Sequence, residues 1–479
     1  MASYNYFSSA RDLAKSIQER ELSAREVMEA HLAQIETINP EVNAIVSLDE
    51  EHALKKADKA DELLAAGKEV GPFHGLPIAI KDTHNAKGFP MTSGSLALRD
   101  NISTDDDLVV ERLKKAGAIV IGKTNVPEFG AGSHTFNKVF GITRNPYNLN
   151  RTAGGSSGGA AAAVATGMLP FAEGSDMGGS CRNPAAFNNV VGMRTSPGRV
   201  PTYPKPALFS PLLAQGPITR SVEDASFMMS VLAGPDTRSP ISIEEPGKLF
   251  LQPFSKDIKG LRIAWSADLG GLIPVDPSIR SNIEEQMKIF TDLGCHVEEA
   301  CPDLTEADEV FHVFRAWEME MSHKELFDKF EEVMKPSFKW NFNKGRKLSG
   351  IEIGRAERLR NQLYHRTRDF FDQYDALIVP VSQVPPFDAN LEYPKQINDV
   401  PMENYIDWMR SNYYISALGN PALSVPSGFT SDGLPLGLQV VGPHRADYEV
   451  LRIGHAFEQA TNYGKKRPAI ATLKDHYIS

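Results

Sequence analysis

The feature that most restricts the fold is a stretch rich in small residues at 151–198. It contains the run GGSSGG at 154–159, followed directly by an alanine-rich run at 160–165. Glycine permits sharp turns and leaves backbone N–H groups open to a ligand, and alanine forms helices without bulk. We therefore expect a glycine loop that leads into a helix packed closely against a sheet. A second small-residue turn at 175–180 then presents a serine hydroxyl beside open N–H groups.

Taken alone, this stretch allows other interpretations. A GGSSGG block is also typical of flexible linkers. A phosphate-binding loop is unsupported, because no Gly-Lys-Ser/Thr follows the glycines. Residues 155–159 fit the G-x-S-x-G nucleophile elbow, with Ser157 as the nucleophile. That motif needs a preceding strand, whereas 145–152 has the composition of a turn, so the elbow is disfavoured.

Alternating apolar runs and helical patterns predict an α/β protein. Apolar runs at 76–81 and 118–121 predict strands, the first ending on Lys81, and the pattern between them predicts a helix at 106–116. Continuous apolar strands are typical of a sheet buried on both faces, and the later strands are expected to continue that sheet. These later strands are predicted at 261–265, 376–381, 422–426 and 437–441. Further helices are predicted from the capping box at 23–26 to 38, where Asn39-Pro40 should stop the helix, and at 49–66, 221–233 and 306–374.

Bulk properties disfavour several classes of function. A net charge of −10 argues against a nucleic-acid or anionic-membrane partner, and no apolar run is long enough to span a membrane. Residues 1–7 lack the basic start and apolar segment of a signal peptide. The three cysteines are scattered and no H-E-x-x-H motif occurs. We expect a cytoplasmic monomer or homodimer that uses no cofactor and no metal.

The strand ending on Lys81 and the two glycine–serine turns together resemble the amidase signature family of serine hydrolases. The matching segments are 77–82, 122–125 with Glu128 and Phe129, 154–159, 178–180 with Arg182, Pro184 and Phe187, 216–217 with 220–224, and 433–439. The resemblance extends from about residue 8 to about residue 468. It implies one large α/β domain with a mixed β-sheet core covered by helices on both faces.

Three parts of that single domain, 1–479, are expected to differ in role. By resemblance, 1–70 is a helical cover, 71–235 is the catalytic core, and the helical insertion at 306–375 helps to shape a substrate funnel. Aromatic residues in the insertion are more typical of a core than of substrate contacts. The proline-rich loop at 199–211 is expected either to wrap the sheet or to wall a pocket.

The resemblance implies a Ser–Ser–Lys triad. Ser180 would be the nucleophile, Ser156 would relay protons from a position after a cis peptide bond to Gly155, and Lys81 would be the base in its neutral form. The apolar residues before Lys81 provide a low-dielectric wall that would lower its pKa. No histidine lies within 151–198, and His84 and His134 are expected to be structural or peripheral. A Ser-His-Asp triad is therefore a weaker interpretation.

The same resemblance assigns supporting roles around Ser180. The backbone N–H groups of Met177, Gly178, Gly179 and Ser180 would form an oxyanion hole. Asp176 and Arg182 are expected to brace this turn as an ion pair. Gly130, Met177 and Cys181 are the predicted substrate contacts.

Some positions depart from the usual family pattern, notably Glu173, Met177, Cys181 and 194–195. None of these departures removes a triad residue. Those that flank Ser180 affect the choice of substrate rather than activity.

The expected reaction is hydrolysis of a carboxylic amide through an acyl-enzyme to give a carboxylate and an amine or ammonia. The predicted substrate is a small neutral aryl or alkyl amide. The same chemistry serves carbamates (urethanes) and esters, which remain alternatives. A glutamine-hydrolysing component of a tRNA amidotransferase is less favoured, because 214–217 reads Ala-Gln-Gly-Pro without the aspartate usual before Gln in that component. A non-catalytic binding protein would be expected to have lost Lys81 or one of the two serines.

Overall fold

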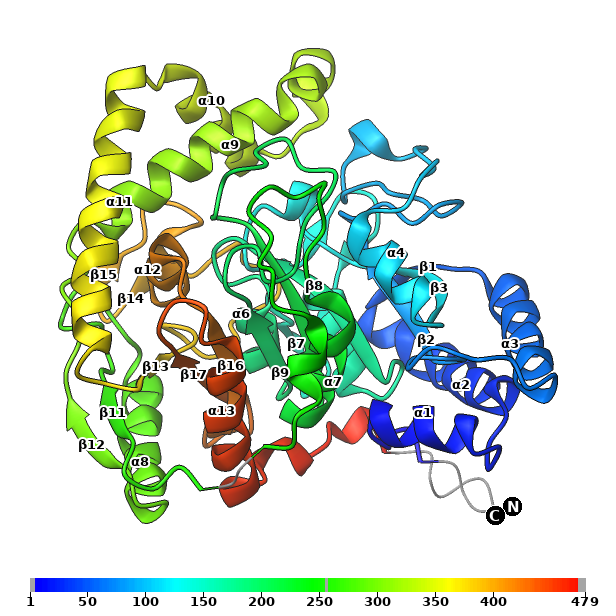
Figure 1. Cartoon of the computed structure of the whole chain (residues 1–479). Coiled ribbons are helices and arrows are strands. Elements are labelled where there is room, and N and C mark those ends of the chain that lie inside the picture. Colours follow the sequence, from blue (N-terminus) through cyan, green and yellow to red (C-terminus); the bar gives the residue numbers. More distant parts are fainter. Residues whose placement is uncertain (1–4, 255–256, 473–479) are drawn as a thin grey trace.

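A large mixed β-sheet forms the centre of the computed structural model, which describes residues 5–254 and 257–472 (Figure 1). Its strand order is β12-β11-β13-β17-β16-β9-β10-β8. Strand β11 pairs in parallel with β12 and β13, and the other pairings in this sheet are antiparallel. The strands are β8 (Phe171–Asp176), β9 (Val191–Arg194), β10 (Ala214–Thr219), β11 (Arg262–Trp265), β12 (His296–Glu299), β13 (Ala376–Pro380), β16 (Ala422–Phe429) and β17 (Pro435–Val441).

A smaller sheet has the order β1-β3-β2, formed by β1 (Ile45–Leu48), β3 (Ile119–Thr124) and β2 (Pro77–Lys81). The predicted strands at 76–81 and 118–121 therefore exist, but the prediction that they share one sheet with the later strands is wrong. The backbone N–H of Lys81 does not extend a ladder onto the edge strand β8. It donates instead to the side chain of Glu173 on β8, at 2.6 Å. That side chain takes the place of a backbone partner and separates the two sheets.

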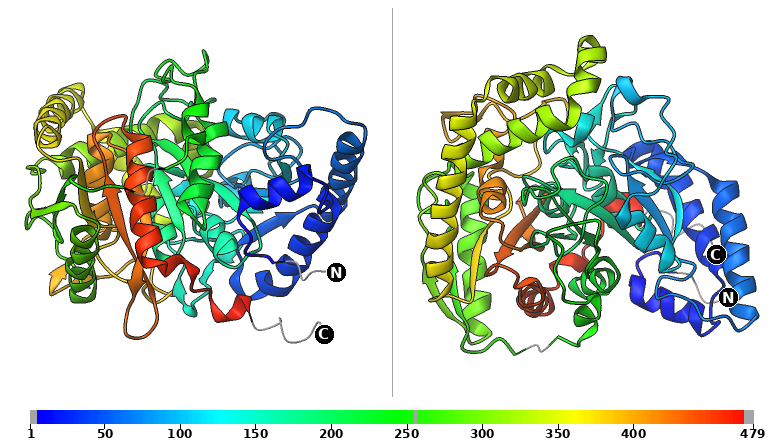
Figure 2. Two further views of the ribbon diagram at one scale, coloured as in Figure 1. Left: turned by 60° about the horizontal axis from the view of Figure 1, so that its bottom comes forward. Right: turned by 45° about the horizontal axis from the view of Figure 1, so that its top comes forward.

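Helices cover both faces of the large sheet (Figure 2), and close contacts from β16 and β17 identify the helix on each face. Leu423 and Val425 face Gly454 of α13 (Asp447–Thr461), where an added Cβ would lie 2.4 Å from Leu423. On the opposite face, a Cβ at Gly437 of β17 would lie 2.7 Å from the Cβ of Ala186 in α6 (Arg182–Phe187). The predicted α/β fold with helices on both faces is confirmed.

The N-terminal helices are α1 (Ala10–Gln18), α2 (Ala24–Val42) and α3 (Glu50–Ala65). The predicted capping box is present, since Ser23 and Glu26 bond reciprocally at the start of α2. The prediction that Asn39-Pro40 stops this helix is wrong. Pro40 lies inside α2, which ends at Asn43 in the left-handed conformation with φ +55°. Asparagine tolerates that conformation well and can close a helix there.

The region predicted as helical at 306–374 consists of α9 (Ala307–Phe330), α10 (Pro336–Lys347) and α11 (Gly350–Phe371). Figure 1 shows α9 running across the top of the molecule above the end of β8. The other helices are α4 (Leu108–Lys115), α5 (Gly158–Ala165), α7 (Val222–Leu232), α8 (Pro277–Asp292) and α12 (Arg410–Leu418).

Candidate active site

The turn that carries Ser180 follows strand β8 and depends on two glycines. Gly179 has φ +112°, and a Cβ there would lie 2.5 Å from the side chain of Asn412. A Cβ at Gly178 would lie 2.8 Å from the ring of Phe311. Only glycine fits both places, so the chain can turn sharply and leave Ser180 at its tip with 8% of its surface exposed.

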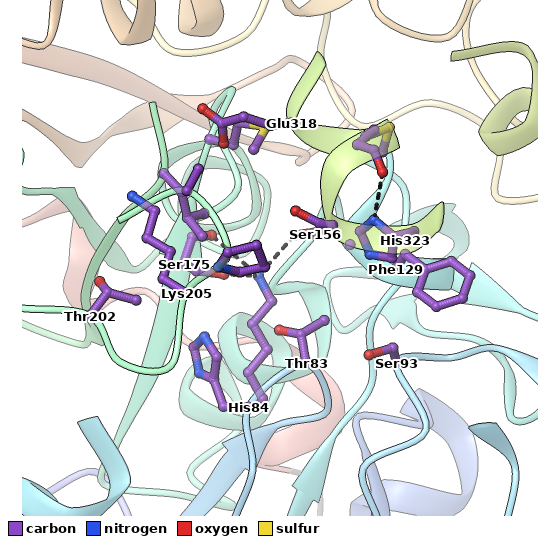
Figure 3. A pocket seen from close by; sticks show the side chains of 18 of the residues that line it. Thr83, His84, Ser93, Phe129, Ser156, Ser175, Thr202, Lys205, Glu318 and His323 are labelled. Carbon is purple, nitrogen blue, oxygen red and sulfur yellow. Dashed lines mark hydrogen bonds between the residues drawn. The ribbon is translucent and has the colours of Figure 1, made fainter. Parts of the chain in front are cut away.

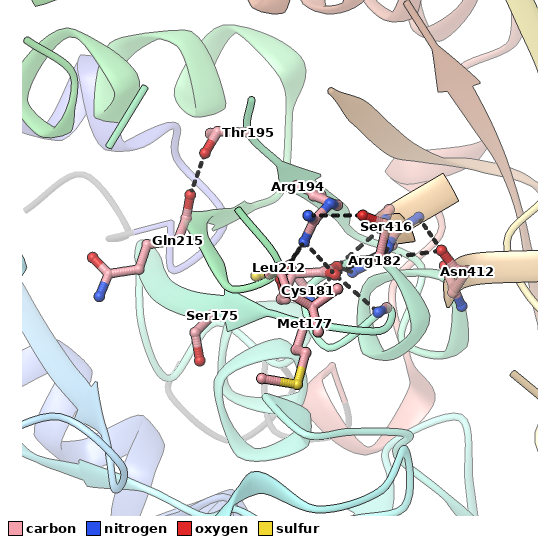
Figure 4. A network of polar contacts seen from close by, with 12 residues as sticks. Ser175, Met177, Cys181, Arg182, Arg194, Thr195, Leu212, Gln215, Asn412 and Ser416 are labelled. Atoms are coloured by element: carbon pink, nitrogen blue, oxygen red, sulfur yellow. Dashed lines mark hydrogen bonds and ion pairs between the residues drawn. The ribbon is translucent and has the colours of Figure 1, made fainter. Parts of the chain in front are cut away.

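Asp176, the last residue of β8, organises this turn. Figure 4 shows the network around it, with Arg182 and Arg194 labelled. Its carboxylate accepts from the Gly179 N–H at 2.8 Å and from the Cys181 N–H at 3.2 Å. It also pairs with the guanidinium groups of Arg182 at 2.9 Å and Arg194 at 3.5 Å, and all three side chains are fully buried. Burial alone would raise the pKa of Asp176, but the two arginines hold it well below its ordinary value. The predicted Asp176–Arg182 brace is confirmed.

The glycine loop enters α5 as expected, and every residue of that helix is buried. A Cβ at Gly159 would lie 2.4 Å from the backbone nitrogen of Asn125, and one at Gly158 would lie 2.3 Å from Thr135 Oγ1. The peptide bond between Gly155 and Ser156 is cis. This close packing places Ser156 next to Gly130, where an added Cβ would lie 3.5 Å from Ser156 Oγ.

Lys81 lies at the end of β2 with only 1% of its surface exposed. Its Nζ donates to Ser156 Oγ at 2.8 Å, to Ser175 Oγ at 3.0 Å and to the Ser175 carbonyl at 3.2 Å. Burial lowers the pKa of Lys81, while the negative charges of Glu173 and Asp176 oppose that shift. Asp82 points away and accepts from Thr92 and Gly94, as the alternation of a strand predicts.

The two serines predicted to act together lie in adjoining turns. The Ser157 N–H donates to the Ser180 carbonyl at 3.1 Å and ties the turns together. Within the described part of the chain, no hydrogen bond joins the hydroxyls of Ser156 and Ser180. The structure thus places Lys81 and Ser156 in direct contact, with Ser180 beside them on the same cavity.

Sequence reasoning missed the role of His84 beside Lys81. His84 Nδ1 lies 2.9 Å from Glu173 Oε2, and the imidazole lines the cavity. Burial alone would raise the pKa of Glu173, but its contact with His84 and the hydrogen bond from the Lys81 N–H lower it. Of the two roles expected for His84, structural or peripheral, its place on the cavity excludes the peripheral one. The unusual Glu173 was a signal in the sequence, because a buried carboxylate requires a partner. His134 is structural, bonded to Thr152 Oγ1 and the Ala389 carbonyl.

Two assignments around Ser180 differ from the predictions. The Gly179 N–H already donates to Asp176, which leaves the N–H groups of Met177, Gly178 and Ser180 without a backbone or side-chain acceptor among the described residues. Cys181 is fully buried and lies outside the cavity lining, so its prediction as a substrate contact is wrong. Its sulfur faces Gly174 on β8, where an added Cβ would lie 2.9 Å from Sγ.

A cavity of about 380 Å³ opens above these groups (Figure 3). We call Lys81, Ser156, Ser175 and Ser180 the cavity floor. Gly130 and Met177 line the cavity beside the floor, as predicted. The remaining lining residues are Thr83, His84, Met91, Ser93, Leu98, Asp107, Phe129, Thr202, Pro204, Lys205, Pro206, Ala207, Leu213, Gln215, Arg315, Glu318, Met319, Ser322, His323 and Leu326.

Two distant segments form the walls, which we define as 202–207 and the α9 residues 315–326. The proline-rich loop therefore walls a pocket, one of its two expected roles. The Phe, Tyr and Trp residues of the 306–375 region, such as Trp317 and Phe327, are not among the lining residues. Phe129 is, and its φ of +52° holds its ring beside His323 (Figure 3). In residues 5–254 and 257–472, no group of three or more His, Cys, Asp or Glu side chains is arranged to hold a metal ion.

The family model described as Amidase matches residues 26–451. The chain belongs to the amidase family. An acylamidase of Rhodococcus erythropolis is 36% identical over 472 residues, covering 96% of this chain and 97% of the relative. A glutamyl-tRNA(Gln) amidotransferase subunit of Geobacillus thermodenitrificans is 35% identical over 488 residues, covering 96% of this chain and 98% of the relative.

Solved structures agree with this membership. The crystal structure of a bacterial aryl acylamidase of the amidase signature family matches with a TM-score of 0.90 and 31% identity, covering 97% of this chain and 98% of the other. Fatty acid amide hydrolase matches with a TM-score of 0.83 and 25% identity, covering 95% and 85%. The chain is an amidase family enzyme that hydrolyses amide C–N bonds. Among the described residues, no helix is both long and apolar enough to cross a membrane.

Proposed function

We propose that this amidase is a serine hydrolase that works through an acyl-enzyme on Ser180. The observation that carries the proposal is the 2.8 Å hydrogen bond between Lys81 Nζ and Ser156 Oγ, on a cavity that also exposes Ser180. A neutral Lys81 would accept a proton from Ser156 while Ser156 takes one from Ser180. The Ser180 oxygen then attacks the amide carbonyl carbon.

Collapse of the tetrahedral intermediate breaks the C–N bond. The nitrogen leaves as an amine after Ser156 returns a proton drawn from Lys81. Water then attacks the Ser180 ester by the same relay and releases the carboxylate. The N–H groups of Met177, Gly178 and Ser180 are suited to stabilise the oxyanion, since they are free of other acceptors in the described structure and adjoin the nucleophile.

Apolar side chains on one side of the cavity support an aryl or alkyl amide as substrate. Met91, Leu98, Phe129, Met319 and Leu326 line that side. Their burial against an apolar group would contribute to binding. Similarity to an acylamidase and to an aryl acylamidase also supports this substrate class for the chain. Cytoplasmic location and a monomeric or homodimeric state remain predictions.

A substrate panel with purified protein tests this proposal. We expect hydrolysis of acetanilide, and covalent labelling of Ser180 by a fluorophosphonate, located by peptide mapping. A phenyl carbamate, a phenyl ester and glutamine in the same panel separate amidase from urethanase, esterase and glutaminase activity. An adduct on Ser157, or activity only toward glutamine, would contradict the proposal.

A further inference from the structure

In the described structure Arg315, a cation in the cavity wall, lacks the carboxylate partner that Arg182, Arg194 and Arg199 have. Arg315 of α9 lines the cavity and is 4% exposed. Its Nε donates to Asn341 Oδ1 at 3.0 Å, its Nη2 to the Tyr405 hydroxyl at 3.0 Å, and its Nη1 to Met177 Sδ at 3.4 Å. All three acceptors are uncharged.

Three other buried arginines in this protein are paired with carboxylates. Arg182 and Arg194 both pair with Asp176, and Arg199 pairs with Asp447 at 3.0 Å. For Arg315, no carboxylate oxygen lies within 4.0 Å among the residues that the structure describes. A buried charge without a counter-ion is costly, so a pocket that retains one is suited to an anion from outside.

Glu318, one helical turn along α9, does not fill this role. Its carboxylate accepts from the Ser210 hydroxyl and lies beyond ion-pair distance of Arg315. Burial raises the pKa of Glu318, which favours the uncharged form. Figure 3 shows Glu318 on the wall, at the edge of the cavity. Arg315 therefore keeps its positive charge facing the cavity.

Hydrogen-bond donors also outnumber acceptors around the guanidinium. An arginine side chain has five N–H donors, and three of its contacts are named above. The Nδ2 of Asn341, which neighbours it, is buried without an acceptor among the described residues. The Tyr405 hydroxyl uses its own proton on Asn341 Oδ1 at 3.2 Å. Such a cluster is suited to a ligand that only accepts, and a carboxylate is of that kind.

We propose that Arg315 binds a carboxylate on the amide substrate. The proposal rests on the acyl-enzyme function above and refines the neutral amide that the sequence predicts. The substrate class is then an aryl or alkyl amide that carries one acid group. Because Arg315 contacts Met177, three residues before the nucleophile, the acid would lie on the side of the cavity next to the oxyanion donors.

Two matched substrate pairs test this role. Succinanilate and butyranilide differ by a carboxylate on the acyl part, and 4-acetamidobenzoate and acetanilide differ by one on the amine part. The wild type is expected to have a higher kcat/KM for the acid in at least one pair. Arg315→Gln should reduce that preference roughly ten- to a hundred-fold, the value of a hydrogen bond to a charged group. Arg315→Lys should retain part of it.

The exposed Arg355 of α11, paired with Glu309, provides the matched control as Arg355→Gln. This control should keep the wild-type ratio. Wild type that favours neither acid, or an Arg315→Gln that slows both members of each pair equally, overturns the proposal. The proposed acyl-enzyme function is tested separately with Ser180→Ala. If that variant still hydrolyses anilides, the acyl-enzyme proposal is wrong, whatever the role of Arg315.

Binding gives a second measurement that needs no turnover. Calorimetry of Ser180→Ala with succinanilate and 4-acetamidobenzoate should show binding of at least one of the two acids. The double variant Ser180→Ala/Arg315→Gln should bind that acid more weakly. Thermal unfolding of each variant establishes that it is folded. Equal affinity with and without the Arg315 guanidinium would also overturn the proposal.

Discussion

The cavity floor and the cavity walls are built in contrasting ways. Three of the four floor residues come from the 151–198 stretch, where small side chains and buried backbone leave almost no freedom. The walls come from a loop at 202–207 and from α9, more than a hundred residues later, and they carry charged and apolar side chains together. The chemistry is thus held by local close packing, whereas substrate choice depends on segments that can vary without disturbing it.

The largest expected effect concerns the nucleophile on the floor. Ser180→Ala should lower kcat for an anilide by roughly 10⁴ or more, because removal of a nucleophile leaves only binding and oxyanion stabilisation. Stopped assays at high enzyme concentration measure the residual rate. The control is Ser157→Ala, whose side chain is fully buried and outside the cavity, and which should change kcat far less. If the two variants lost activity equally, Ser180 could not be assigned as the nucleophile in preference to Ser157.

The next effect concerns the base. Lys81→Ala should lower amide turnover by roughly 10³, within the range for general-base removal, and should reduce ester turnover less, because an alkoxide leaves without full protonation. Burial lowers the pKa of Lys81, so wild-type activity should rise with pH through that lowered pKa and remain high on the alkaline side. The pH–rate profiles of both enzymes are the measurement. An active Lys81→Arg would show that a permanent cation suffices.

A smaller effect is expected from removing the negative charge of Glu173, which adjoins the floor, and not from removing a carboxyl group of the wall. Negative Glu173 stabilises protonated Lys81, so Glu173→Gln should lower the pKa of Lys81 and move the acid limb of the pH–rate profile to lower pH. The amide of glutamine can still accept from the Lys81 N–H. Glu318→Gln, a buried wall carboxylate, should leave the position of that limb unchanged. A limb that moves with Glu318 and not with Glu173 would reverse their roles.

The smallest effect belongs to the apolar wall. Leu326→Ala should raise KM for an anilide roughly three- to ten-fold and leave kcat near its wild-type value, since it removes contact with the substrate body but no reacting group. Steady-state kinetics separates the two constants. Ile351→Ala, a change to a side chain that is 83% exposed on α11, is the control. A loss in kcat rather than KM would mean that this wall also positions the scissile bond.

The contrast explains what the sequence could reveal. Glycine pairs beside Ser156 and Ser180, and an apolar strand ending on Lys81, are local patterns with a direct physical meaning, and the structure brings Lys81 and Ser156 into contact as predicted. The α/β class and most strands and helices also followed from local periodicity. The proline-rich loop and the 306–375 insertion were expected as possible walls, but no local pattern indicates which of their side chains face the cavity. Arg315 is one of several charged residues on a helix, and only the fold shows that it faces the cavity.

The separation of the strands into two sheets was not predicted, for a related reason. Nothing near Lys81 in sequence indicates that its N–H bonds to Glu173, a residue 92 positions away. The engaged N–H of Gly179 was missed because the side chain of Asp176 turns back onto its own turn. A side-chain acceptor that replaces a backbone partner leaves no periodic pattern in the sequence. The separation of the two sheets and the engaged Gly179 N–H could therefore be found only in the three-dimensional structure.

Arg182 also ties the Ser180 turn to segments that are synthesised much later. Besides Asp176, it donates to the Asn412 carbonyl at 3.1 Å, to Ser416 Oγ at 2.8 Å and to Gln439 Oε1 at 2.8 Å. During translation, Ser180 emerges from the ribosome long before α12 and β17 have been synthesised. The nascent chain therefore contains all three residues of the proposed triad while the Ser180 turn lacks most of the contacts that support it. Closure of these long-range contacts comes late in folding, so hydrolysis should begin only after β17 has emerged.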